Sequence, residues 1–411
     1  MPDKNSLDSE AFEKAEKCGL VFSDDKKILL KCKDLGITPE IVIPQGVTII
    51  GEKAFFGCGS LSSVKIPDSV TTIGEEAFCH CEVLSNVTIP PNVTVIGKRA
   101  FEGVWQISSD NPKFPVDRFG VLFDAENQTL LQAPWKLSGS YSVPDGIAAI
   151  GEEAFFNCHE LTEIHLPDSV TDIGKDAFFF CKSLTDINIP PHVVTIGEHA
   201  FSNCDKLAVI HIPTKVASIG PGAFPHSGKI TSDNRIFPVD PSGILFDLKH
   251  RKILYVPWDL TGHYSIPAGI TTIEKSSFYG CKKLTGVTIP DSVTTIGIGA
   301  FERCESLISA IIPDSVTSIG DFAFYGCKNL TRVKISHQVA VIGEEVFCDC
   351  SSLSSVDIPD GVTEIGVRSF CGCPKLTRVT IPDSVTSIRK NAFIGSGCEA
   401  QVKQRYSHLF K

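Results

Sequence analysis

Apolar residues recur along most of the chain with a period of 23 positions, and this period determines the predicted structure. The clearest marker is the dipeptide Ile-Pro, in which Val or Leu sometimes replaces Ile and Ser336 once replaces Pro. The apolar residues of its thirteen copies are Ile43, Ile66, Ile89, Val143, Leu166, Ile189, Ile212, Ile266, Ile289, Ile312, Ile335, Ile358 and Ile381. Within each uninterrupted block these residues are 23 positions apart, so the chain is a tandem repeat.

Other positions keep the same register, and each unit has the pattern L-x-x-V-x-I-P-x-x-V-x-x-I-G-x-x-A-F-x-x-C-x-x. A second Ile, usually followed by Gly, comes seven residues after the Ile of Ile-Pro, and a Phe comes twelve residues after it. A Cys stands three residues further on in ten copies, namely Cys58, Cys81, Cys158, Cys181, Cys204, Cys281, Cys304, Cys327, Cys350 and Cys373.

The spacing of apolar residues within one unit predicts a short β-strand. Val64 and Ile66 are separated by one residue, so both point inward in an extended strand while Lys65 points outward. The glycine of Ile-Gly suits a tight turn, and the segment G-x-x-A-F-x-x-C has room for one or two helical turns. One unit cannot bury its own apolar face, so we expect successive units to stack as coils and to align their apolar residues in ladders.

The repeat resembles that of the BspA-like leucine-rich-repeat proteins, also called the Treponema pallidum subclass. The strings IPDSVTSIG at Ile312–Gly320 and AFYGC at Ala323–Cys327 carry this resemblance, which extends from Ile43 to about Phe393. It implies an α/β repeat solenoid: a right-handed leucine-rich-repeat superhelix with a parallel β-sheet on its concave face and short helical turns on its convex face. The members of that family are largely surface or secreted proteins, several of them implicated in adhesion and in binding host matrix proteins.

Two insertions of 31 residues interrupt the repeat, one after Phe101 and one after Phe224. They match each other in sequence, since both contain F-P-V-D, then G-V-L-F-D or G-I-L-F-D, and then Pro-Trp. Each has an apolar strand, a polar turn (125–128 or 248–251) and a second apolar strand. This order predicts a β-hairpin in each insertion.

Together the blocks and insertions divide the chain into seven predicted segments. Near the N-terminus, Gly19–Phe22 followed by Ile28–Leu30 looks like a third, incomplete hairpin copy. We expect the first and last segments to cover the ends of the apolar core, which would otherwise be exposed. The segments are an N-terminal cap (1–42), a repeat block (43–106), a hairpin insertion (107–142), a second block (143–229), a second insertion (230–265), a third block (266–393) and a C-terminal cap (394–411).

Composition and charge narrow the classes of partner. The chain has a formal net charge of −10, and no run of Lys or Arg offers the basic patch of a nucleic-acid-binding protein. No apolar stretch approaches the roughly 18 residues of a membrane span, so membrane insertion is not expected. The polar N-terminus lacks the apolar region of a signal peptide. We expect a monomer without a cofactor.

Four cysteines form an unusual pair of motifs, because C-D-C and C-G-C are one repeat apart. Cys348 and Cys350 are each 23 residues before Cys371 and Cys373, respectively. If all four thiols lie together, they could bind a zinc ion or form a disulfide. If alternate residues point to opposite sides, they are small buried residues like the other repeat cysteines.

The residues at the outward position of the predicted strands are candidates for partner binding. They are mixed and mostly small or polar: Lys65, Thr88, His165, Asn188, His211, Thr288, Ile311, Lys334, Asp357 and Thr380. Parallel sheets in solenoids commonly bind proteins on this side. His165, Asn188 and His211 are in successive units, with Glu163 and Asp186 nearby, so either a solvated surface or an acid–base or metal site remains open.

Tryptophan is confined to the insertions and their borders. Trp105, Trp135 and Trp258 are the three tryptophans of the chain. Aromatic residues are frequent anchors of binding interfaces. Trp135 and Trp258 are therefore either partner-binding residues or packing residues that hold each hairpin on the solenoid.

We find no motif of a nucleophile, phosphate loop, zinc protease or carboxylate pair, and therefore no candidate catalytic residue. The first hypothesis is a non-catalytic protein-interaction solenoid, by resemblance an adhesin-like or host-contact protein at the cell surface or secreted. The alternative is a cytoplasmic scaffold or regulatory protein, favoured by the free thiols and the absent signal peptide. A third hypothesis is a metal- or redox-responsive protein that uses the paired cysteine motifs.

Overall fold

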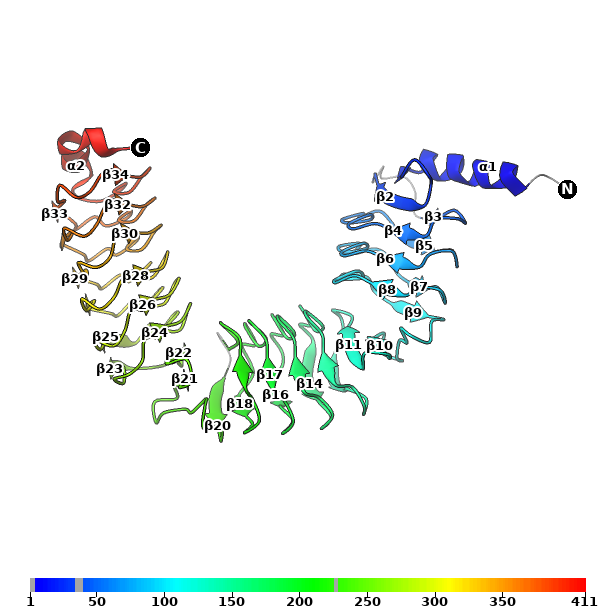
Figure 1. Cartoon of the computed structure of the whole chain (residues 1–411), viewed down its shortest axis with the longest axis horizontal. Coiled ribbons are helices and arrows are strands. Elements are labelled where there is room, and N and C mark those ends of the chain that lie inside the picture. The colour runs from blue at the N-terminus through cyan, green and yellow to red at the C-terminus, as the bar shows by residue number, and fades with distance from the viewer. Residues whose placement is uncertain (1–3, 34–39, 225–227) are drawn as a thin grey trace. The chain divides into compact units, whose positions relative to one another are not determined.

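Each repeat unit forms one coil containing two short strands, and the coils stack along the chain (Figure 1). The structure, a computed structural model, describes residues 4–33, 40–224 and 228–411, so parts of the predicted N-terminal cap and second repeat block lie outside it. The chain divides into two compact units. Unit 1 comprises the residues up to Ala208 together with Lys215–Gly220, and unit 2 comprises Val209–Thr214 together with Pro221–Lys411.

The first strand of most coils is the predicted V-x-I strand, and a further strand at the start of each insertion continues the same row. All of these strands are here called the first row. In unit 1 they are β3 (Glu40–Val42), β5 (Ser63–Lys65), β7 (Val87–Ile89), β9 (Ile107–Ser109), β12 (Gly139–Ser142), β14 (Leu161–His165) and β16 (Asp186–Asn188). In unit 2 they are β18 (Val209–Ile212), β20 (Lys229–Ser232), β23 (Gly262–Ser265), β25 (Leu284–Thr288), β27 (Ser309–Ile311), β29 (Arg332–Lys334), β31 (Ser355–Asp357) and β33 (Arg378–Thr380). The paired neighbours are parallel and keep the repeat register, as Val356 with Val379 illustrates.

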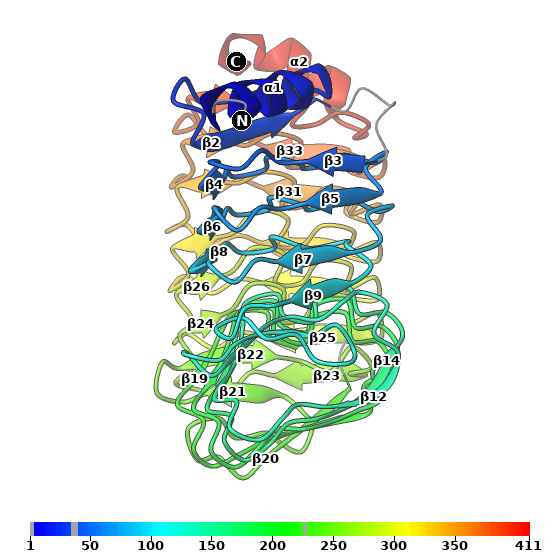
Figure 2. The same ribbon diagram turned by 90° about the vertical axis from the view of Figure 1, so that its right-hand side faces the viewer.

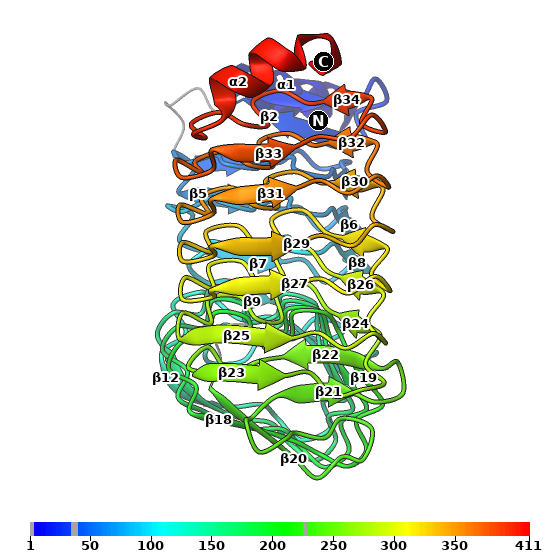
Figure 3. The same ribbon diagram turned by 90° about the vertical axis from the view of Figure 1, so that its left-hand side faces the viewer.

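A second row of two-residue strands ends at the Ile of Ile-Gly. Its members in unit 1 are β4 (Ile49–Ile50), β6 (Thr72–Ile73), β8 (Val95–Ile96), β13 (Ala149–Ile150), β15 (Asp172–Ile173), β17 (Thr195–Ile196) and β19 (Ser218–Ile219). In unit 2 they are β24 (Thr272–Ile273), β26 (Thr295–Ile296), β28 (Ser318–Ile319), β30 (Val341–Ile342), β32 (Glu364–Ile365) and β34 (Ser387–Ile388). Both rows are visible side by side in Figure 2 for the start of unit 1 and in Figure 3 for the end of unit 2.

The predicted hairpins are present, and each contributes a rung to the second row. They are β1 (Leu20–Phe22) with β2 (Ile28–Cys32), β10 (Leu122–Asp124) with β11 (Thr129–Gln132), and β21 (Leu245–Asp247) with β22 (Lys252–Tyr255), all antiparallel. The second strand of each hairpin then pairs in parallel with the next second-row strand, as Leu130 does with Ile150. Each hairpin therefore begins a new run of coils instead of lying outside the solenoid.

A buried asparagine ties each inserted segment to the coil before it. The side-chain amide of Asn111 donates to the backbone carbonyls of Pro90 and Val93, at 3.0 and 2.7 Å. Asn234 does the same in the second copy, with the carbonyls of Pro213 and Thr214. Because a buried carbonyl without a donor is costly, these contacts fix the path of the chain into each insertion.

The apolar residues of successive coils form ladders within each run of coils between the insertions. The repeat Phe side chains are fully buried and stack face to face, with ring centroids 4.9 Å apart for Phe55 and Phe78 and 5.2 Å apart for Phe301 and Phe324. Stacking at this distance adds to the burial of the rings. The solenoid predicted from the repeat is thus confirmed.

The repeat cysteine also makes a specific polar contact. The Sγ of Cys81 lies 3.0 Å from the carbonyl oxygen of Phe55, and that of Cys327 lies 3.2 Å from the carbonyl oxygen of Phe301. A thiol is small enough for the column and is also a weak donor to a buried carbonyl. Within a run of coils, cysteine therefore links a coil to the Phe of the preceding coil, whereas Cys158 and Cys281, which follow the insertions, contact the carbonyl oxygens of Pro134 and Pro257.

The segment predicted to form helical turns instead forms a series of reverse turns. In the coil that contains Phe78, Glu76 and His80 have φ of 52° and 59°. Their N–H groups, with that of Phe78, donate to the next coil, while the N–H groups of Cys79 and Cys81 donate within the coil. Because alternate N–H groups point to a neighbour, a helix cannot form here.

The glycine of Ile-Gly does not have the role that the sequence predicted. It lies outside the positive-φ region in every copy, so no tight turn requires it. Instead the backbones of successive coils meet there: a Cβ on Gly97 would lie 2.3 Å from the backbone nitrogen of Glu75. Glycine is therefore needed for the close approach of two coils.

Helices are found at both ends of the described chain. The helix α1 (Lys4–Lys17) precedes the first hairpin, and its Phe12 packs edge to face against Phe22. The C-terminal residues form α2 (Glu399–Arg405) and a short 3₁₀ helix, η1 (Ser407–Leu409). Val402 is buried against the last coil, and Phe410 bridges to Ile388. These contacts cover the apolar edge of the last coil. The boundaries of the seven predicted segments remain a prediction.

Candidate interaction surface

The outward positions of the first row are solvent-exposed in both units. All ten predicted residues are exposed: Lys65, Thr88, His165 and Asn188 in unit 1, and His211, Thr288, Ile311, Lys334, Asp357 and Thr380 in unit 2. They are exposed because the residues on either side of them in each strand point into the core. Their role in binding a partner remains a prediction.

The histidines of this row do not gather around a reaction centre. His165 lies beside Asn188 on the neighbouring strand, and its Nε2 is 3.4 Å from Glu163 of its own strand. His211 belongs to unit 2, where its Nδ1 is 3.1 Å from the hydroxyl of Thr231. Both imidazoles are solvated and lie outside any cavity described in the structure, so the geometry corresponds to a polar surface.

In unit 2 the first row contains a groove of about 710 Å³ over β25 and β27. It is floored by small residues, since Gly286 and Ser309 occupy the second outward position of their strands. The imidazole of His263 lies over Gly286, where any Cβ would be 2.5 Å from its Nδ1, and its Nε2 is 2.8 Å from the hydroxyl of Thr288. Glycine in this strand therefore makes room for the histidine ring.

The walls of the groove combine exposed apolar and charged side chains. Ile308, just before β27, and Ile311, at the end of β27, are 52% and 62% exposed, which is unusual for isoleucine. On the other side Asp314 lies 3.7 Å from the ammonium of Lys334 and 3.1 Å from the imidazole of His337. An apolar patch next to charged groups is typical of an interaction site.

The four paired cysteines do not converge. Cys348 and Cys371 are joined in a disulfide. Cys350 and Cys373 point into the core, where their thiols contact the carbonyl oxygens of Phe324 and Phe347. Alternate residues of C-D-C and C-G-C thus face opposite sides of the coil. Of the alternatives that the sequence left open, the structure contains the disulfide, and the four sulfur atoms do not form one cluster.

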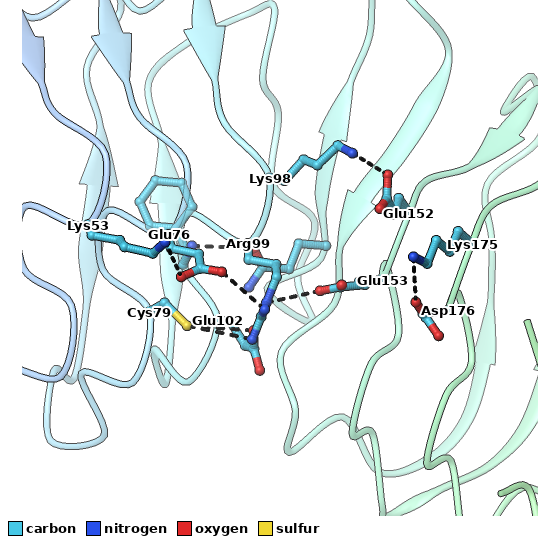
Figure 4. Close-up of polar contacts among 12 residues, drawn as sticks. Lys53, Glu76, Cys79, Lys98, Arg99, Glu102, Glu152, Glu153, Lys175 and Asp176 are labelled. Carbon is cyan, nitrogen blue, oxygen red and sulfur yellow. Dashed lines mark hydrogen bonds and ion pairs between the residues drawn. The ribbon is translucent and has the colours of Figure 1, made fainter. Parts of the chain in front are cut away.

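Sequence reasoning missed a charged cluster in unit 1, centred on Arg99 (Figure 4). The Arg99 guanidinium lies 3.1 Å from Glu76 of the preceding coil, 2.9 Å from Glu153 of the first coil after the insertion, and in contact with Glu102 of its own coil. Burial by itself lowers the pKa of Arg99, but the hydrogen bond and charge of Glu102 and the charge of Glu153 raise it overall. Arg99 therefore stays charged and links the coils on both sides of the insertion.

Cys79, His80 and Glu102 lie close enough together beside Arg99 to suggest a metal site. Burial, followed by the charge of Glu102, raises the pKa of the Cys79 thiol to about 12. The Cys79 thiol donates to Glu102 at 3.6 Å, and Glu102 is also paired with Arg99. The polar groups of Cys79 and Glu102 therefore already have partners within the protein, which favours a structural role for this cluster.

The two tryptophans predicted as anchors have different surroundings. Trp135 is half-buried and lines the small cavity beside Arg99, and the ammonium of Lys136 lies 5.9 Å from its ring. Trp258 is 57% exposed. Their surroundings favour packing for Trp135 and leave Trp258 available to a partner, and both assignments stay predictions.

Comparison with known proteins places the repeat in a family. The profile of the BspA type leucine-rich repeat region matches residues 32–119, 137–236 and 271–399, in six copies. No curated protein sequence matches the chain. In the described residues, none of the helices has the length and apolar character required to span a membrane.

Several solved structures are similar to this chain. A leucine-rich cell surface protein from Faecalibacterium prausnitzii is 28% identical, with a TM-score of 0.47 over 92% of this chain and 90% of that one. A leucine-rich-repeat protein from Bacteroides ovatus is also 28% identical, with a TM-score of 0.37 over 92% and 83% of the two chains. The leucine-rich-repeat protein of T. pallidum is 21% identical, with a TM-score of 0.22 over 71% and 89%.

Proposed function

The chain belongs to the family of BspA-type leucine-rich-repeat proteins, and on that premise we propose that it is a non-catalytic protein that binds other proteins through the outward side of its first-row strands. The observation that carries the proposal is the groove over β25 and β27, where Ile308 and Ile311 are exposed beside Asp314 and Lys334. A partner that covers the two isoleucines gains apolar burial, and the charged rim restricts which partner fits.

The proposed partner is an extracellular protein, either a matrix protein or a protein of another cell's surface. The family resemblance supports a location at the cell surface or outside the cell. The free thiols do not favour the cytoplasmic alternative, because thirteen of the fourteen described free cysteines are buried in the core. Shielded thiols of this kind are inert, so they are compatible with an oxidising compartment as well.

We expect the double variant Ile308→Ser and Ile311→Thr to reduce binding to the partner at least ten-fold. The expected loss follows from the apolar area that the two side chains offer, since burying each is worth roughly 1.5–3 kcal/mol. Thr is already present at the same register in the preceding strand, as Thr288, so the variant keeps the strand intact. Binding is measured with purified full-length chain on immobilised matrix proteins and on intact host cells.

Ile298→Ser is the matched control, because Ile298 is 48% exposed but does not line the groove. It should bind like the parent protein. Equal binding by the groove variant and the control would exclude this face as the contact surface. Failure of the parent chain to bind any of the matrix proteins or cells would contradict the extracellular partner.

A further inference from the structure

A second groove, of about 430 Å³, lies in unit 2 between the hairpin β21–β22 and the turn that follows β23. Its walls are mainly apolar and are formed by Pro238, Val239, Phe246, Leu248, Pro267 and Ile270. Phe246 and Ile270 are buried and form its floor, whereas Leu248 is 52% exposed at its rim. Its volume and lining are those of a small-molecule site, in which apolar walls surround a few polar groups.

Two charged residues, Asp240 and Arg251, border this groove, and only the carboxylate of Asp240 already has hydrogen-bond partners. Asp240 accepts hydrogen bonds from the backbone N–H groups of Ser242 and Ile244 at 2.8 and 2.9 Å, and from the Tyr264 hydroxyl at 2.9 Å. The N–H of Thr271 donates a hydrogen bond to the carbonyl oxygen of Arg251, and this contact fixes the backbone of Arg251. Within the described chain, however, the exposed guanidinium of Arg251 has neither an ion pair nor a hydrogen bond. The groove therefore offers one positive charge to a ligand.

The first hairpin module provides an internal comparison, because each lining residue has a counterpart 123 positions earlier. Seven of the ten lining residues are identical in the two copies, including the buried Phe of the floor and the Asp that binds the tyrosine. The three differences are Leu248 for Ala125, Arg251 for Gln128 and Ala268 for Asp145. Leu248 and Ala268 make the second groove more apolar, Ala268 also removes a negative charge, and Arg251 adds a positive charge. The three substitutions surround one site, and together they favour an apolar ligand that carries a negative charge.

We propose that the groove formed by Phe246, Leu248, Ile270 and Arg251 binds a small monocarboxylate with an apolar tail of medium length. The tail lies between the hairpin and the Pro-Ala-Gly turn, and the carboxylate pairs with the guanidinium of Arg251. An Arg–carboxylate pair of this kind is a strong, charge-assisted contact. The same ligand is excluded from the first module, because Asp145 repels the carboxylate and Gln128 lacks the positive charge of Arg251.

The test is titration calorimetry of the full-length chain with octanoate as the probe. We expect one saturable site per chain, weaker binding of the neutral analogue 1-octanol, and no competition by octyltrimethylammonium. Arg251→Gln should weaken octanoate binding roughly ten-fold while leaving 1-octanol binding unchanged. Lys249→Gln, in the same hairpin turn but outside the groove, is the matched control and should bind as the parent does.

A reciprocal exchange separates ligand binding from folding. The triple variant Leu248→Ala, Arg251→Gln and Ala268→Asp copies the first module and should abolish the site while leaving the melting temperature nearly unchanged. The triple variant Ala125→Leu, Gln128→Arg and Asp145→Ala should raise the stoichiometry from one to two. Equal binding of octanoate and 1-octanol, or octanoate binding that survives Arg251→Gln, would overturn the proposal. Binding of only a peptide that ends in a free Leu carboxylate would also overturn it.

Discussion

Replacement of Phe78 by alanine is expected to lower the free energy of unfolding by about 3–5 kcal/mol. Phe78 is fully buried, and its ring stacks on those of Phe55 and Phe101, with centroids 4.9 and 5.7 Å away. Alanine leaves a cavity in the middle of the ladder that the coils on both sides cannot fill, since each is held by its own backbone hydrogen bonds. Chemical denaturation followed by circular dichroism measures the change.

Phe56→Ala is the control for this experiment, because Phe56 stands beside the ladder but is 46% exposed. We expect its effect to stay below about 1 kcal/mol. If the two variants lose similar stability, the buried Phe column is not the core of the coil stack.

The second large effect is expected from Gly97→Ala, which should destabilise unit 1 by about 3 kcal/mol. An added Cβ would lie 2.3 Å from the nitrogen of Glu75 and 2.6 Å from the carbonyl carbon of Gly74, so two coils must separate. Separation also stretches the hydrogen bond from the Gly97 N–H to the carbonyl of Ile73, now 2.8 Å. The same denaturation measurement reports it.

Gly59→Ala serves as the comparison, because an added Cβ there would come no closer than 4.0 Å, to the carbonyl oxygen of Gly57, apart from its own chain neighbours. It should leave the denaturation midpoint almost unchanged. A tolerated Gly97→Ala would mean that glycine recurs after Ile for a reason other than coil-to-coil approach.

The sequence alone was sufficient for the coil stack and the hairpins, because both are encoded by apolar spacing. A period-two pair such as Val64 and Ile66 can bury both side chains only in a strand, and one coil can bury its face only against the next. The match between the two insertions likewise indicated a shared hairpin, which the pairing of β10 with β11 and of β21 with β22 confirms.

Features that depend on backbone direction could not be predicted in this way. Residues as different as Glu76, Arg99 and Phe322 occupy the same positive-φ position of their coils. Gly or Asn stands there in some other coils, as Gly299 and Asn391 do, so no single residue type marked the reverse turns throughout the repeat. The role of Gly97 could not be predicted either, because a tight turn and the close approach of two backbones both require glycine.

The candidate sites were predictable only in part. The outward row follows directly from strand alternation, and Ile311 was detectable as an apolar residue among polar ones. The Arg99 cluster depends on coils separated by an insertion, since Glu153 is 54 residues from Arg99. The groove beside Arg251 requires the hairpin to lie against a turn, which the sequence did not specify.

The stacking of successive 23-residue coils is tested most directly by disulfide trapping on the first row of unit 2. Asp357 and Thr380 are paired on neighbouring strands, and the hydroxyl of Thr380 lies 2.8 Å from the carboxylate of Asp357. Cysteines at both positions should form a disulfide under mild oxidation, because neighbouring strands are about 5 Å apart. Cysteines at 334 and 380, two coils or about 10 Å apart, should not. Peptide mass spectrometry that finds no 357–380 link, or as much 334–380 link, would contradict the account.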